Sequence, residues 1–157
     1  MSARLRLEPV GLERGRALVE GHLDALAPLH AGAGWPHADT MDGLRMSLAE
    51  PIDDEQTALL AVLVDTDEVV GEGGWKGPPG PDGVVEIGYG LAPPYRGRGL
   101  GSELVGLLTA WVLDQEGVRR VVAEVLADNL PSRRALERNG YRLTHVDEPY
   151  VWYAYAP

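Results

Sequence analysis

The segment that most constrains the fold is a glycine- and arginine-rich turn between a strand and an amphipathic helix. The strand is predicted at Val84–Leu91, and the turn reads Arg96-Gly97-Arg98-Gly99-Leu100-Gly101. Apolar residues then recur on one helical face, at Leu100, Leu104, Leu107, Leu108 and Trp111. Such a unit aims free main-chain N–H groups and the positive helix end at whatever lies over the turn. The pattern therefore predicts an anion site, and a phosphate fits it.

Spacing separates the phosphate-binding motifs that compete for this turn. A P-loop needs Gly-Lys followed by Ser or Thr, but the only lysine, Lys76, is followed by Gly77. A dinucleotide fingerprint needs a third glycine where Ser102 stands, and the repeated strand–helix units of that fold are missing. On these residues alone, a glycine-rich turn that starts a helix without a ligand stays open.

Length and composition limit the class of protein. A chain of 157 residues fits one domain, and 45% hydrophobic with 24% charged residues is typical of a soluble globular protein. No apolar run is long enough to span a membrane, and the N-terminus lacks the features of a secretory signal, so we expect a cytoplasmic protein. The absence of cysteine excludes thiolate zinc sites and a cysteine nucleophile, and the four histidines show no metal spacing. We expect no metal.

The charges are segregated along the chain. The formal net charge is -10, yet residues 96–142 carry eight arginines against six acidic residues. This division predicts an anionic ligand at the positive segment and a cationic partner at the acidic remainder, and it argues against nucleic-acid binding. The alternative for the acidic part is that it only keeps the protein in solution.

The order of predicted elements indicates an α+β fold. We expect strands at 5–10, 57–64, 68–75, 84–91, 121–126 and in the aromatic end of the chain, 150–155. One helix is predicted to carry Leu18, Val19, Leu23 and Leu26 and to end before Pro28 or before the stretch 31–34. A second is predicted from Asp39 or Thr40 to Ala49, ending at Pro51 and the acidic residues 53–55, and a short last helix ends at Gly140.

Two motifs together resemble a known family. The pair is Arg96-x-x-Gly99-x-Gly101 and Asn129-x-x-Ser132, the latter followed by Leu136-Glu137-Arg138-Asn139-Gly140-Tyr141. It resembles the acetyl-CoA signature of the GNAT N-acetyltransferase superfamily, and the strand residues 86–91 are most similar to the RimJ/RimL branch. The resemblance covers about residues 84–141. It implies one GNAT domain over 1–157, with a mixed, mostly antiparallel sheet of six to seven strands, splayed at a bulge beside the cofactor and flanked by about four helices.

The resemblance also implies how acetyl-CoA binds. The end of the strand would pair with pantetheine through Tyr89, Gly90, Leu91, Ala92 and Pro93. The pyrophosphate would lie on the turn formed by Arg96, Gly97, Arg98, Gly99, Leu100, Gly101 and Ser102. Asn129 and Ser132 would bond the pantetheine or phosphate side, and Arg133, Arg134 or Arg138 would reach the 3′-phosphate. Asn129 can equally be a helix cap, and these arginines can equally be solvated.

Amide formation requires that the amine lose a proton, which a positioned carboxylate can accept. Glu86 and Glu124 each interrupt an apolar strand at a position where family members place a glutamate base, and Glu86 is preferred. The alternative for each is a salt bridge or an outward-facing side chain. The N–H of Leu91 would hold the oxyanion. Leu136 stands where many relatives have a tyrosine general acid, which leaves water or another donor such as Ser132.

The residues that would bind the acceptor amine are the least defined part of the predicted site. The candidates are Trp35, His37, Asp39, Trp75, His145, Tyr150 and Trp152. The function predicted is acetyl transfer from acetyl-CoA to a primary amine, which is a protein N-terminal α-amine or a small-molecule amine and is expected to be cationic. The acyltransferase is expected to be a monomer or a homodimer and to bind neither nucleic acid nor membrane. The alternative is a non-catalytic acyl-CoA-binding sensor or regulatory module.

Overall fold

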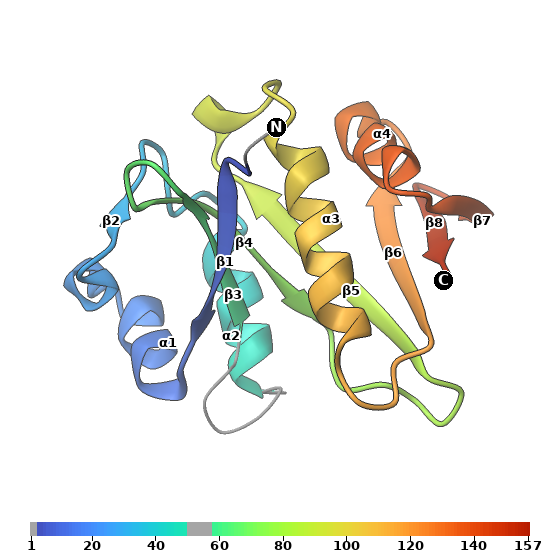
Figure 1. Ribbon diagram of the computed structural model, residues 1–157, viewed down its shortest axis with the longest axis horizontal. Helices are drawn as coiled ribbons and strands as arrows, with labels where there is room; N and C mark the ends of the chain where they lie inside the picture. Colours follow the sequence, from blue (N-terminus) through green and yellow to red (C-terminus); the bar gives the residue numbers. More distant parts are fainter. Residues whose placement is uncertain (1–2, 50–57) are drawn as a thin grey trace.

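The computed structural model describes residues 3–49 and 58–157 and shows one mixed sheet with helices on both faces (Figure 1). Its strand order is β1-β3-β4-β5-β6-β8-β7, and the two-residue β2 (His30–Ala31) pairs with β4 off this path. The bounds are β1 (Leu5–Val10), β3 (Ala58–Leu63), β4 (Glu68–Trp75), β5 (Val84–Leu91), β6 (Arg120–Leu126), β7 (Arg142–Asp147) and β8 (Tyr150–Tyr155). The predicted α+β class is confirmed.

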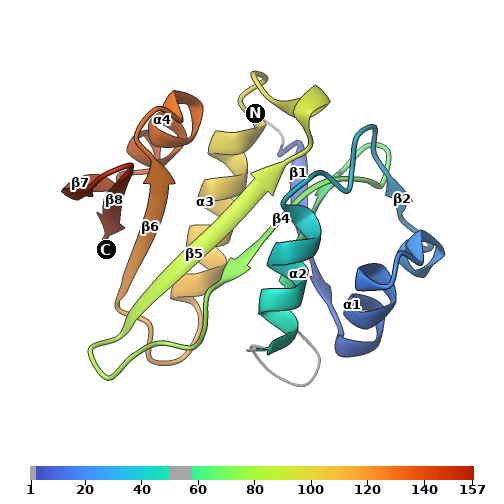
Figure 2. The ribbon, with the colours of Figure 1, turned by 180° about the vertical axis from the view of Figure 1, so that it is seen from behind.

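The helices cover the two faces unequally. They are α1 (Leu12–Val19), α2 (Thr40–Ala49), α3 (Leu100–Leu113) and α4 (Leu130–Arg138), with short 3-10 turns η1 (Leu23–Leu26) and η2 (Pro93–Tyr95). A Cβ at Gly73 of β4 would touch Leu108 of α3, whereas one at Gly74 would approach Ser47 of α2. In Figure 2, α1 and α2 lie in front of the β1, β3 and β4 half, and no described helix lies in front of β6, β8 and β7.

Three elements differ from the sequence expectation. The first helix is broken, because Gly21 adopts a left-handed φ of 92° that ends α1 and starts a separate turn, η1. The strand β7 was not predicted; all six of its residues are exposed, so it has no alternating apolar pattern. The short β2 also escaped prediction. The expected helix end at residues 51–55 lies outside the described part of the chain.

The strands β5 and β6 separate along their length. Their parallel pairing runs only from Val84↔Arg120 to Glu86↔Val122, and beyond it the two strands diverge (Figure 1). On the other side, β5 keeps an uninterrupted antiparallel register with β4, from Trp75↔Ile87 to Gly71↔Leu91. The predicted splay is therefore present, but the predicted bulge in β5 is not, because β5 simply follows β4 away from β6.

A polar clamp joins α3 to the end of α4 beneath the splay. Asn139 Nδ2 donates to the carbonyl oxygens of Ser102 at 2.8 Å and Ala135 at 2.7 Å. The buried hydroxyls of Thr109 and Tyr141 are 2.6 Å apart, and Thr109 donates to the carbonyl of Val105. Tyr141 must then be the donor to Thr109. Burial raises the pKa of Tyr141 to about 12, with the Thr109 hydrogen bond opposing the shift.

The clamp predicts the effect of Tyr141→Phe. Loss of one buried hydrogen bond should lower the free energy of unfolding by about 1 kcal/mol at pH 8, measured by urea denaturation. An unfolded tyrosine ionises near pH 10 and the folded Tyr141 near 12, so the folded chain holds one more proton between these values. The contribution of this group is complete below pH 10 and is lost as the pH rises to 12. Equal alkaline slopes for both proteins would contradict the assignment.

Candidate active site

The glycine turn has the shape that the sequence predicted for an anion site. Gly97 and Gly99 have φ angles of 77° and 79°, which favour glycine, and Gly99 is the residue before the first turn of α3. The first N–H groups of a helix have no partner within it, so those of α3 are available above the turn. Nothing lies within 4 Å of where a Cβ on Gly97 would stand. The main chain is therefore open at Gly97, whereas at Gly99 the Arg4 guanidinium lies 3.2 Å from where a Cβ would stand.

The arginines of the turn stabilise its conformation and also give it positive charge. Arg96 Nε donates to the carbonyl of Leu91 at 2.9 Å, which ties the turn to the end of β5. Arg4 donates to the carbonyl of Arg98 at 2.7 Å, and the Arg98 guanidinium lies 5.8 Å from the centre of the Tyr95 ring. Arg96 and Arg98 are nevertheless exposed, so their charge remains at the surface beside α3.

The outer edge of β5 presents main-chain groups that β6 no longer pairs, although the Leu91 carbonyl accepts from Arg96 Nε. Hydrogen bonds from Lys76 N to Glu86 O (2.7 Å) and from Ala92 N to Val70 O (2.8 Å) fix the alternation of the β4–β5 ladder. In an antiparallel pair the main-chain groups of alternate residues point to opposite sides, so those of Tyr89 and Leu91 point away from β4. They face the splay, beyond the last described β5–β6 pair. An extended ligand can pair there as an additional strand would.

The start of α4 lies across the splay from this edge. The hydroxyls of Tyr89 and Ser132 are 2.7 Å apart and bridge β5 to α4, and burial raises the pKa of Tyr89 although the Ser132 hydrogen bond opposes the shift. Asn129 accepts from Ser132 N at 3.3 Å and so caps the helix. Arg133 donates to the Tyr153 hydroxyl and the Ala127 carbonyl, whereas Arg134 is exposed. The structure thus brings Tyr89, Asn129 and Ser132 together.

The two predicted glutamates occupy the face opposite α3. Their strand neighbours Val85, Ile87, Ala123 and Val125 are buried in the core under that helix, so Glu86 and Glu124 point the other way. Glu86 forms an ion pair with Lys76 at 2.7 Å. Glu124 is partly exposed, and its main chain pairs in register with Trp152. Its carboxylate forms no hydrogen bond or ion pair with the described residues.

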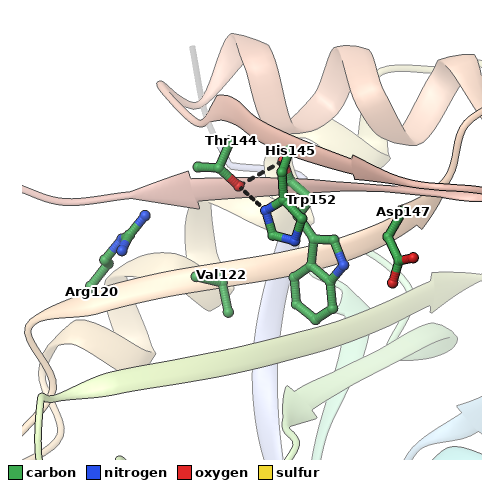
Figure 3. Close-up of a pocket in the computed structure, with 6 residues that line it drawn as sticks. All are labelled: Arg120, Val122, Thr144, His145, Asp147 and Trp152. Atoms are coloured by element: carbon green, nitrogen blue, oxygen red, sulfur yellow. Dashed lines mark hydrogen bonds between the residues drawn. The ribbon is translucent and has the colours of Figure 1, made fainter.

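The same face carries an open cavity at its far edge. It has a volume of about 470 Å³ and is lined by Arg120, Val122, Thr144, His145, Asp147 and Trp152 (Figure 3). The His145 and Trp152 rings stack, with centres 5.6 Å apart and planes 9° from parallel. Thr144 contacts His145 Nδ1 at 3.1 Å and donates to the Trp152 carbonyl. Tyr150 begins β8 and is 38% exposed.

The remaining acceptor candidates separate into two places. Trp75 lies on the α3 face, where its ring packs edge-to-face against Trp111 at 6.2 Å. Trp35 and His37 instead converge on Glu72, a buried residue of β4 that the sequence analysis did not single out. A carboxylate in an otherwise apolar or glycine segment was the available signal, the same one that identified Glu86 and Glu124.

Glu72 accepts three hydrogen bonds inside the protein. Its Oε1 accepts from Trp35 Nε1 at 3.0 Å and from Thr40 Oγ1 at 2.6 Å, and its Oε2 lies 2.9 Å from His37 Nε2. The side chains of His37 and Glu72 are only 7% and 10% exposed. This network fastens the loop before α2 to the middle of the sheet.

The described residues contain neither a candidate metal-binding cluster nor a candidate membrane-spanning helix. Within residues 3–49 and 58–157, no group of three or more His, Cys, Asp or Glu side chains is arranged to hold a metal ion. In the same ranges no helix has both the length and the apolar character needed to cross a membrane.

Comparison with known proteins places the chain in a family. The family model of the acetyltransferase (GNAT) domain matches residues 4–142, so the chain belongs to the GNAT acetyltransferases. The uncharacterized N-acetyltransferase YjdG of Bacillus subtilis is 28% identical over 158 residues, which cover 97% of this chain and 94% of that protein. The finer RimJ/RimL placement remains a prediction.

Solved structures share the fold. A putative ribosomal-protein-serine acetyltransferase from Vibrio cholerae superposes with a TM-score of 0.68 at 15% identity, covering 100% of this chain and 96% of that one. The microcin C7 self-immunity acetyltransferase MccE, solved with acetyl-CoA and AMP, gives 0.64 at 15% identity, with 99% and 94% covered. GNAT relatives therefore bind acetyl-CoA in this fold.

A substitution at Gly101 tests the turn. A Cβ there would meet only Leu91 Cδ1 at an ordinary 3.7 Å, so Gly101→Trp should fold while its ring covers the first turn of α3. We expect coenzyme A at 100 times its Kd to stabilise the wild type by about 2.7 kcal/mol and the variant hardly at all, measured by denaturation with and without the ligand. Gly43→Trp, on an exposed site of α2 with nothing within 4 Å, is the matched control. Equal stabilisation of all three proteins would refute the assignment.

Proposed function

We propose that this protein transfers an acetyl group from acetyl-CoA to a primary amine by direct attack in a ternary complex. The observation that carries the proposal is the meeting of two main-chain features at the splay. The free edge of β5 at Tyr89 and Leu91 runs into the open glycine turn at Gly97 and Gly99. An extended thiol arm with a diphosphate at one end matches both features at once.

The residues present fit the cofactor. The turn and the first amides of α3 would hold the pyrophosphate, with Arg96 and Arg98 adding surface charge, and the edge of β5 would hold the pantetheine. Across the splay, Ser132 and Asn129 would contact the same arm, and Arg134 and Arg138 are the exposed arginines of α4 that could reach a phosphate. Acetyl-CoA supplies the acetyl group as a thioester, which an amine can attack without a covalent enzyme intermediate.

The protein's own contribution to the chemistry is positional and electrostatic. The N–H of Leu91 points into the splay and would donate to the oxyanion that develops during attack. A side chain on the face opposite α3 would accept the amine proton, and Glu86 and Glu124 are the candidates from the sequence. Glu124 is the less engaged of the two, because Lys76 already holds Glu86.

The acceptor that this face favours is a cationic amine. Glu86, Glu124 and Asp147 all belong to strands that form the face opposite α3. The chain outside 96–142 is also strongly acidic. The stacked His145 and Trp152 rings add a flat wall on which an acceptor can rest. A protein N-terminal α-amine and a small-molecule amine both fit, and the relatives' names include a ribosomal-protein acetyltransferase and an antibiotic self-immunity enzyme.

A second function, a non-catalytic acyl-CoA sensor, is favoured by one observation. Leu136, at the position where many relatives have a tyrosine acid, is completely buried in the core and cannot donate a proton. A thiol with a pKa near 8.5 leaves tolerably without full protonation, so we keep the enzyme as the first proposal.

Release of coenzyme A separates the two functions. We expect the protein with acetyl-CoA to release thiol faster when amines are added, and most with cationic amines such as polyamines, aminoglycosides or basic N-terminal peptides. The measurement is thiol release against a panel that includes uncharged amines of matched size. Tight cofactor binding with no amine-stimulated release would establish the sensor instead.

A further inference from the structure

The hydrogen-bonded network around Glu72 lies at the reacting end of the proposed site. Glu72 pairs in register with Gly90, the residue before Leu91 on the edge of β5. A Cβ on Gly90 would come within 2.9 Å of Glu72 Oε2 and of His37 Cε1. The imidazole and the carboxylate therefore rest directly on the main chain of β5, on the face where Glu86 points, and next to the N–H proposed to hold the oxyanion.

The charge of Glu72 has no permanent counterion. Its described partners are the Trp35 indole, the Thr40 hydroxyl and the His37 imidazole, and none is an arginine or a lysine. Removing a carboxylate from water costs several kcal/mol unless a positive charge compensates it. A proton taken up by His37 during the reaction would place a positive charge 2.9 Å from this carboxylate.

The contacts also define which nitrogen can accept a proton. A carboxylate only accepts hydrogen bonds, so the 2.9 Å contact places the imidazole proton on Nε2. Nδ1 then carries the lone pair, which among the described residues meets only the Asp39 N–H, at a long 3.4 Å. This is the carboxylate–imidazole arrangement in which one nitrogen is oriented by the acid and the other is free to act as a base.

We propose that His37 is the general base of the transfer and that Glu72 is its positioning residue. The inference rests on the proposed function. The amine nitrogen bonds to the acyl carbon as the carbon–sulfur bond breaks, and the electron pair of that bond leaves with sulfur. The nitrogen's proton passes to Nδ1 of His37, directly or through one water, and Glu72 stabilises the imidazolium until the proton reaches the departing thiolate or solvent.

The charged groups around His37 are few. From β4 the imidazole meets Glu72, and from β5 it meets Gly90, which has no side chain. From α2 the neutral Thr40 hydroxyl accepts from the main-chain N–H of His37. Asp39, on its own loop, contributes a main-chain N–H. Glu86 lies farther along β5 and is bound to Lys76. A pH effect at His37 should therefore respond mainly to Glu72.

The first test examines the His37–Glu72 pair by NMR and requires no enzymatic turnover. In cofactor-free protein with ¹⁵N-labelled histidine, His37, assigned through H37Q, should show the Nε2–H tautomer at high pH. Glu72→Gln removes the negative charge and keeps the side chain's size, so the titration midpoint of His37 should move to lower pH. An Nδ1–H tautomer, or a midpoint that E72Q leaves in place, would overturn the proposal.

The second test uses the pH dependence of kcat/KM. We expect H37Q to lower kcat/KM at neutral pH by about 10²- to 10⁴-fold, with unchanged affinity for coenzyme A. In this variant the fall of kcat/KM at acidic pH, which we call the acidic limb of the pH profile, should disappear. E72Q should retain a limb, displaced to lower pH. H22Q, at a histidine whose side chain is 63% exposed, should match the wild type.

The outcomes distinguish this inference from the function on which it rests. A wild type that binds no coenzyme A, or releases none with any amine, contradicts the function, while the NMR titration still reports on the pair. An active wild type whose profile is unchanged in H37Q overturns the inference. The inference is also overturned if E86Q or E124Q, and not H37Q, removes the acidic limb of the pH profile. Should H37Q fail to fold, E72Q carries both measurements.

Discussion

The structure depends on one interruption of main-chain hydrogen bonding, the loss of β5–β6 pairing after Glu86. A sheet that continued through Leu91 and Leu126 would satisfy the edge of β5 internally and leave nothing for a ligand to pair with. Because β5 stays in register with β4 while β6 follows β8, the divergence leaves one row of N–H and C=O groups without a partner on β6. Of these groups, the Leu91 carbonyl accepts from Arg96 Nε. The glycine turn, the start of α4 and the Glu72 network all border that gap.

Two apolar cores maintain the separation between β5 and β6. One lies under β1, β3, β4 and the start of α3, and the other under β6, β8 and α4, with Tyr89 packed against both. The Tyr89–Ser132 contact and the Asn139 clamp fix the distance between the halves. The first core also includes Leu18 of α1 and Leu44 of α2, so packing on both faces of the sheet positions the site. The candidate proton acceptors lie on the face opposite α3. Glu72, Glu86 and Glu124 all point to that side, and Trp75 does not.

Much of this arrangement could be predicted from the sequence, and the reasons for the rest are physical. The strand–turn–helix unit from Val84 to Trp111 is strongly periodic, and Gly97 and Gly99 have the positive φ angles expected of a turn. The break at Gly21 and the exposed β7 lack such a pattern. The partners of Glu72 could not be predicted, because they depend on how the loop 32–39 folds across β4. The face to which Trp75 points depends likewise on strand register, which local sequence does not determine.

The central claim is that the free edge of β5 and the glycine turn bind one ligand together. Amide hydrogen exchange by NMR, with and without coenzyme A, tests it most directly. The account predicts that coenzyme A slows exchange at Leu91 and at the amides from Gly97 to Ser102 and leaves exposed amides of α2, such as that of Gly43, unchanged. Binding that protects neither the strand edge nor the turn would contradict it.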